Sequence, residues 1–171
     1  MSTANDIEGI LARLETVRRR IDEAALRAGR AAGSVRLIAV SKGKPAEVIR
    51  AAYALGQRDF GENYAQELAD KAETLQGLDG LRWHAIGRLQ RNKAKQVVRL
   101  AQTIHAVDRE ELAVELGRRA TAAGLSLDAL VEVNISGEAS KGGCAPAALA
   151  GLLAAMRRTA GLRVVGLMTI G

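Results

Sequence analysis

The sequence has almost none of the side chains that form disulfides or bind transition metals. Cys144 is the only cysteine, and His84 and His105 are the only histidines. A lone cysteine excludes an internal disulfide and a multi-cysteine metal site. A catalytic metal would therefore need carboxylate ligands, and we expect none.

Aromatic side chains are also scarce, and the positive charge is dispersed. The formal net charge is +6, but the basic residues stand beside acidic ones along predicted helices. Proteins that bind single-stranded nucleic acid stack its bases on aromatic side chains. The only aromatic residues here are Tyr53, Phe60, Tyr64 and Trp83. We therefore expect no nucleic-acid partner.

Long hydrophobic runs are absent as well. No apolar stretch is long enough to cross a bilayer, and the first residues lack the pattern of a signal peptide. The sequence thus predicts a cytoplasmic protein without a membrane partner.

Short apolar segments alternate with segments of helical periodicity along the whole chain. This alternation predicts a parallel sheet flanked by helices, in a single domain spanning residues 1–171. We expect strands at 37–40, 58–60, 81–85, 103–106, 127–133 and 162–168, and helices at 6–28, 45–55, 64–75, 89–100, 108–123 and 146–159. In the fifth of these helices we expect Asp108 and Glu111 to cap the first turn.

The predicted strands favour a barrel. No glycine-rich nucleotide-binding loop is present, so a (β/α)8 barrel of the TIM type is favoured over an open nucleotide-binding sheet. The chain ends directly after the sixth predicted strand, which predicts a barrel truncated there, incomplete at its C-terminal end. A complete chain of this kind would be a monomer, whereas open strand edges would favour self-association.

The stretch from Leu37 to Pro45 stands out within this pattern. Residues 37–40 suit a strand buried on both faces, and Lys42 follows where the strand ends, at the edge where α/β proteins bind ligands. A lysine amine becomes a nucleophile after losing its proton, which desolvation or a neighbouring cation such as Lys44 favours. The alternative is that Lys42 and Lys44 are solvated loop lysines.

Other polar residues follow the remaining strands and would share one rim of a barrel. Each also has a structural interpretation: His84 as a hydrogen-bonded core residue, Asn63 as a helix cap, and Met168 as core packing. Further rim residues are His105 with Asp108, and Asn134 with Ser136. A single lysine among neutral polar groups suits a carbonyl ligand held as a Schiff base. The residues alone do not choose a reaction.

Several motifs, in order along nearly the whole chain, resemble those of the pyridoxal phosphate homeostasis protein family. They are Ala39-Val40-Ser41-Lys42-Gly43-Lys44-Pro45, Phe60-Gly61-Glu62-Asn63-Tyr64, the segment from Trp83 to Lys93, Val133-Asn134-Ile135-Ser136 with Ser140-Lys141-Gly142-Gly143, and the segment from Gly166 to Gly171.

The resemblance implies a fold like the N-terminal barrel domain of alanine racemase. It also implies that Lys42 holds pyridoxal 5′-phosphate (PLP) as a Schiff base and that Asn63 lies near the cofactor ring. His84 and Met168, on the same motifs, would line the pocket. The family acts in vitamin B6 homeostasis without established turnover, and its members are thought to pass PLP to apo-enzymes.

Two departures from the family pattern matter. The usual Ser-Lys-Thr-Lys-Pro has Gly43 in place of threonine, and the family's last two strands, with a phosphate-binding cup and an arginine facing the pyridine nitrogen, have no counterpart here. The sequence therefore predicts a non-catalytic PLP-binding protein, with a PLP-dependent amino-acid racemase as the alternative. That alternative needs a base on each face of its substrate.

Overall fold

Six parallel strands in sequential order form the centre of the molecule. We analysed a computed structural model that describes residues 3–138 and 140–170, with side chains from Ile7 onward. The sheet order is β1-β2-β3-β4-β5-β6. The strands are β1 (Ala39–Val40), β2 (Asp59–Glu62), β3 (Arg82–Ala85), β4 (Ala101–Val107), β5 (Leu127–Glu132) and β6 (Leu162–Met168).

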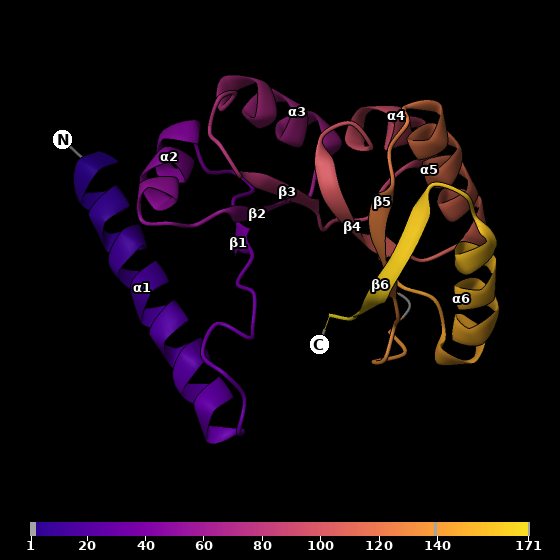
Figure 1. Cartoon of the computed structure of the whole chain (residues 1–171), viewed down its shortest axis with the longest axis horizontal. Helices are drawn as coiled ribbons and strands as arrows, with labels where there is room; N and C mark the ends of the chain where they lie inside the picture. Colours follow the sequence, from indigo (N-terminus) through magenta and orange to yellow (C-terminus); the bar gives the residue numbers. More distant parts are fainter. Residues whose placement is uncertain (1–2, 139, 171) are drawn as a thin grey trace.

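One helix precedes the first strand, and the others connect successive strands, as parallel pairing requires. They are α1 (Thr3–Arg27), α2 (Ala46–Ala54), α3 (Ala65–Thr74), α4 (Ala94–Val97), α5 (Glu110–Ala122) and α6 (Leu149–Arg158), with short 3₁₀ turns at Arg91–Lys93 and Pro146–Ala148. Figure 1 shows α3 to α6 along the outside of the sheet and the long α1 beside α2 at the other end. The predicted α/β barrel type, with six of its strands, is confirmed.

The hydrophobic core lies between the sheet and these helices. Side chains alternate between the two faces of a strand, and the helix-covered face carries apolar residues such as Phe60, Trp83 and Ile104. Leu112 and Leu116 of α5 and Met156 of α6 are fully buried against it. The opposite face carries polar side chains of β2 to β5, which leaves it free to form a site.

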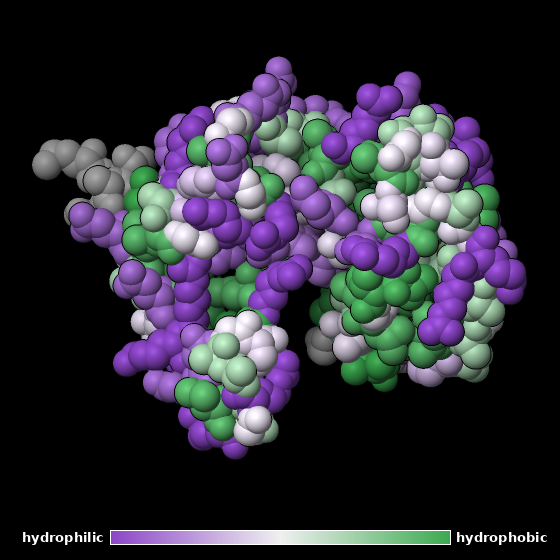
Figure 2. Space-filling view, viewed as in Figure 1, coloured by the Kyte–Doolittle hydropathy of each residue, from purple (hydrophilic) through white to green (hydrophobic). Residues whose placement is uncertain are grey.

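The two outer strands have a neighbour on one side only within the described residues. Residues 37–40 were predicted to be buried on both faces, and this is wrong: β1 has only two residues, and Val40 is 52% exposed. The reason is that β1 is a sheet edge that pairs with β2 alone. At the other edge, Val165, Leu167 and Ile170 are exposed. Figure 2 shows hydrophobic residues gathered there, beside a hollow that separates them from the N-terminal part.

The prediction that Asp108 caps the helix after β4 is also wrong. Arg109 occupies the N-cap position of α5 without a side-chain capping bond. The Asp108 carboxylate instead pairs with Arg109 and lies 3.7 Å from the Arg88 guanidinium. Two arginines compete with the backbone for this carboxylate, so Asp108 belongs to the rim and not to the helix cap.

Among the residues described here, no helix combines the length and the apolar character needed to span a bilayer.

Candidate functional site

The carboxyl ends of the strands surround a cavity of about 480 Å³. Three of the four predicted site residues line it: Lys42 after β1, Asn63 after β2 and Met168 at the end of β6. His84 does not line the cavity, because its ring is buried behind that of His105. The structure therefore brings three of the predicted residues together and places the fourth one hydrogen bond away.

The loop that carries Lys42 is fixed on both sides of this residue. On one side, the Ser41 hydroxyl donates to Glu62 Oε1 at 2.6 Å, and the Ser41 carbonyl accepts from Lys71 Nζ at 2.6 Å. On the other side, the Gly43 amide donates to Glu67 Oε1 at 2.6 Å. Gly43 has a φ of 67°, which glycine adopts without strain. Lys42 itself stays exposed at the cavity.

Lys71 of α3 joins these contacts into one network. Its ammonium lies 2.7 Å from both Glu62 Oε1 and Glu67 Oε1, and its side chain is only 10% exposed. The hydrogen bond from Lys71, with smaller contributions from the Gly43 amide and the charge of Lys71, outweighs burial and lowers the pKa of Glu67. The sequence shows Glu67 and Lys71 as an ordinary i,i+4 surface pair, so their role under the Lys42 loop was not predictable from it.

A close contact between two loops positions Asn63 at the cavity. Tyr64, not Asn63, occupies the N-cap position of α3, and no side-chain capping bond forms there. The backbone of Asn63 lies against Gly87, where a Cβ atom would be 2.6 Å from the Asn63 carbonyl oxygen. Only a glycine at position 87 allows this approach, so Gly87, which follows the third predicted strand on the expected rim, shapes the site through its lack of a side chain.

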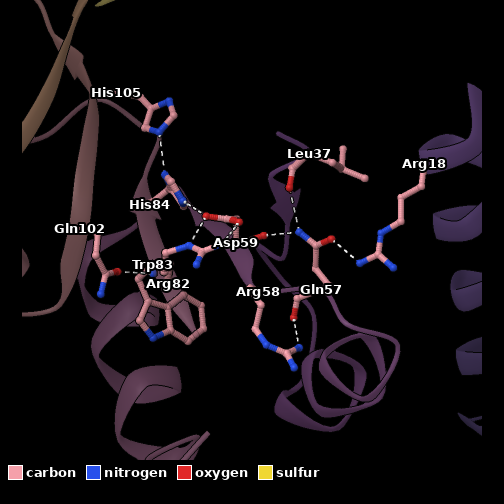
Figure 3. A network of polar contacts seen from close by, with 10 residues as sticks. All are labelled: Arg18, Leu37, Gln57, Arg58, Asp59, Arg82, Trp83, His84, Gln102 and His105. Atoms are coloured by element: carbon pink, nitrogen blue, oxygen red, sulfur yellow. Dashed lines mark hydrogen bonds and ion pairs between the residues drawn. The ribbon is translucent and has the colours of Figure 1, made fainter. Parts of the chain in front are cut away.

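A chain of polar side chains runs along the inner face of the sheet to the cavity (Figure 3). Arg82 binds Asp59 through two hydrogen bonds of 2.8 and 2.6 Å. Asp59 Oδ1 also lies 2.9 Å from His84 Nε2, and His84 Nδ1 lies 3.0 Å from His105 Nε2. His105, one of the predicted rim residues, lines the cavity at the end of this chain.

The protonation states of these hydrogen-bonded side chains follow from that of the Asp59 carboxyl group. Burial raises the pKa of Asp59, but the hydrogen bonds from Arg82 and His84 outweigh this effect and lower it to about 2. The ionised carboxylate therefore accepts a hydrogen bond from His84 Nε2–H. Burial lowers the pKa of His84, so its ring is neutral and Nδ1 accepts from His105 Nε2. His105 Nδ1, which points away from His84 in Figure 3, is left as an acceptor.

This arrangement makes stability dependent on pH. Burial, and then the charge of His84, lower the pKa of His105 from 6.5 to about 4. The folded state thus disfavours protonated His105, so its contribution to stability is complete above pH 6.5 and is lost as the pH falls toward 4. The half-buried ring should contribute about 2 kcal/mol of this loss, since solvent contact reduces the full value of about 1.4 kcal/mol per pKa unit.

Urea unfolding at pH 7 and pH 4.5 would measure this dependence, with His105→Gln as the comparison. The loss of stability between the two pH values should be smaller in the variant than in the parent chain. An equal loss in both would contradict the assignment to His105.

A buried carboxyl group that the sequence analysis missed also lines the cavity. Glu132 at the end of β5 is 4% exposed, and its Oε2 has no hydrogen-bond partner. Burial, and then the charge of Asp108, raise its pKa, while Arg88 lowers it. Its position at the end of a strongly apolar strand was the available signal, because a charged residue there is seldom buried without a purpose.

Asn134 has a structural role in the loop that covers this part of the cavity. Its Oδ1 accepts from the Gly137 amide at 2.9 Å, and its Nδ2 donates to the Glu138 carbonyl at 2.9 Å. Among the described residues, no group of three or more His, Cys, Asp or Glu side chains is arranged to hold a metal ion. The site is thus an amine, the guanidinium of Arg88, several neutral polar groups and one buried carboxyl around a common cavity.

Comparison with known proteins places this chain in a family. A family model described as the alanine racemase N-terminal domain matches residues 13–171. The pyridoxal phosphate homeostasis protein of Pseudomonas aeruginosa is 47% identical over 151 residues, which cover 88% of this chain and 65% of the relative. Such coverage means that the chain spans about two thirds of the length of this relative.

Solved structures agree with this match. A protein of Bifidobacterium adolescentis, described as unknown, superposes with a TM-score of 0.91 at 38% identity, over 100% of this chain and 73% of the other. PipY of Synechococcus elongatus, in a structure with PLP bound, superposes with a TM-score of 0.77 at 40% identity, over 91% of this chain and 70% of the other.

Proposed function

Since the chain belongs to the family of pyridoxal phosphate homeostasis proteins, we propose that it binds PLP as a Schiff base on Lys42 and acts in vitamin B6 homeostasis without catalysing a turnover. The relatives are named for homeostasis and not for a reaction, which supports the non-catalytic part. A cytoplasmic location and delivery of PLP to apo-enzymes remain predictions.

The observation that carries the proposal is the position of Lys42. Its amine is exposed at a cavity of about 480 Å³, within the range of about 300–1,000 Å³ that small-molecule sites occupy. Asn63 and Met168 line the same cavity. These residues fit a ligand that carries an aldehyde, and the PLP bound to PipY, a relative 40% identical to this chain, is such a ligand.

Each part of the site has a distinct task in this proposal. When bound, PLP supplies an aldehyde that condenses with a primary amine. The network of Ser41, Lys71 and Glu67 holds the backbone on both sides of Lys42, so that the amine is directed to the cavity. Asn63 and Met168 form the walls beside it.

Reduction with borohydride tests the covalent link. After incubation with PLP, the chain should gain the visible absorption band of a Schiff base. Borohydride should then fix one PLP on the peptide that contains Lys42. Lys42→Ala should lose the label almost completely, whereas Lys44→Ala, a lysine in the same loop, should retain it. Label that persists in Lys42→Ala at the level of the parent chain would overturn the assignment.

Amino-acid racemisation is the second candidate, and one observation favours it. His105 presents an acceptor nitrogen to the cavity that holds Lys42, and a racemase needs a base on each side of its substrate. With PLP present, exchange of amino-acid α-protons in deuterated water that depends on both Lys42 and His105 would favour the racemase. Absence of exchange at saturating PLP would favour the non-catalytic function.

A further inference from the structure

We propose that Glu132 is the binding group for a primary ammonium ion, that of a small amine or an amino acid, within the cavity lined by Lys42. The proposal adds a second ligand to the proposed function. It rests on that function only in that PLP would lie beside this ligand. The ammonium site itself is argued from the burial and contacts of Glu132.

The first evidence is the burial of an unsatisfied carboxyl group. Glu132 is 4% exposed, its Oε2 has no hydrogen-bond partner, and the side chain lines the cavity. The loop after β5 covers it, and a Cβ atom at Gly142 would lie only 3.0 Å from Glu132 Oε1. Glycine at this position thus lets the loop close over the carboxyl group without filling the space beside it.

Glu62 provides an internal comparison. It is also buried with an unpartnered Oε2, but its Oε1 accepts from the Ser41 hydroxyl and from the Lys71 ammonium. The fold therefore supplies Glu62 with its own cation. Glu132 has no such ion pair with any described residue, so its carboxyl group is open to a positively charged ligand.

The neighbouring arginines and Lys141 face other carboxylates, and Lys42, which lines the same cavity, forms no ion pair with Glu132 among the described residues. Arg109 pairs with Asp108, and Arg88, whose side chain is 75% exposed, lies 3.7 Å from the same carboxylate. Lys141, in the loop above the cavity, pairs with Glu138 at 2.8 Å. A buried carboxyl group without a partner is unfavourable. A ligand that brings both N–H donors and positive charge would relieve this cost.

The surroundings decide which cation fits. A metal ion needs several ligands, and the described residues offer no group of three His, Cys, Asp or Glu side chains. A primary ammonium needs acceptors for up to three N–H groups. Glu132 offers a carboxyl group. His105 offers Nδ1, which is an acceptor because the hydrogen bonds from Asp59 through His84 place the His105 proton on Nε2. An organic ammonium ion therefore matches the site.

Thermal unfolding of the cofactor-free protein tests the proposal. The probes are ethylamine hydrochloride, glycine and sodium acetate, each compared with sodium chloride at the same ionic strength. Ethylamine and glycine should raise the melting temperature in a saturable way, and acetate should not. Equal stabilisation by acetate and ethylamine would overturn the proposal.

Two variants separate Glu132 from other effects. Glu132→Gln keeps the shape but removes the charge, so it should melt at a higher temperature than the parent chain without ligand and need about tenfold more ethylamine, or more, for the same shift. Gly142→Ala keeps the carboxyl group but places a methyl beside it, and should also lose the ethylamine response. Glu73→Gln, an exposed residue of α3, should behave as the parent chain.

Two results would contradict the inference. One is a lower melting temperature of Glu132→Gln without ligand, together with an unchanged ethylamine response in Gly142→Ala. The other is an unchanged ethylamine response in Glu132→Gln. Since no PLP is present, failure here would leave the labelling of Lys42 untouched, and failure of that labelling would leave the ammonium site untouched.

Discussion

Replacing Lys71 with methionine should lower the free energy of unfolding by about 3–5 kcal/mol, the usual effect of removing one partner of a buried ion pair. Methionine retains much of the length of the side chain but cannot donate to the Ser41 carbonyl, Glu62 or Glu67. The Glu62 carboxylate, whose side chain is 0% exposed, would then keep only the Ser41 hydroxyl as a donor. Urea denaturation at pH 7 would measure the loss.

Two further variants show whether the buried charge is the cause. Glu62→Gln combined with Lys71→Met removes both charges, and should recover part of the lost stability because the two sites are coupled. Glu67→Gln leaves the ion pair between Lys71 and Glu62 intact, and should lower stability by only about 1 kcal/mol. A loss below about 1 kcal/mol in Lys71→Met would contradict the role of this network.

Replacing Gly87 with alanine should weaken PLP binding on the order of tenfold or more, because small displacements of positioning groups have large effects. The added Cβ would lie 2.6 Å from the Asn63 carbonyl oxygen and 2.8 Å from its Cα, so the backbone of Asn63 must move. Overpacking of this kind should also lower stability by about 1–3 kcal/mol. Titration with PLP, followed by absorbance, would measure the first effect, and urea denaturation the second.

Gly151 of α6 provides the matched control. A Cβ atom there would meet nothing within 4 Å. Gly151→Ala should therefore raise stability by about 0.5–1 kcal/mol, because alanine favours the helix, and should leave PLP binding unchanged. If Gly87→Ala bound PLP as tightly as Gly151→Ala, the contact between Gly87 and Asn63 would not position the site.

The sequence predicted the order of the elements well, because apolar periodicity and glycine positions agreed along the chain. Its errors came from tertiary context. Residues 37–40 have the composition of an interior strand but form a sheet edge, and composition does not reveal how many neighbours a strand has. Asp108 has the spacing of a helix cap, but its carboxylate pairs with the adjacent Arg109 and lies near Arg88 of another segment.

The site was predictable where function depends on position in the sequence, and less so where it depends on contacts across the sheet. Lys42, Asn63 and Met168 follow strand ends and meet at the cavity. His84 lies within β3 instead, and its hydrogen bond to Asp59 of the neighbouring β2 is a contact that no local sequence pattern encodes. Glu132 could have been noted as a charge within an apolar strand.

The strands that line the cavity differ in how many neighbouring strands they have. Within residues 3–138 and 140–170, β1 has a partner on one side only, whereas β4 and β5 each have partners on both sides. Amide protons of outer strands exchange with solvent sooner than those of central strands, since they open at lower free energy. Lys42 thus follows an outer strand, whereas His105 and Glu132 lie on central strands, whose amide protons should exchange later.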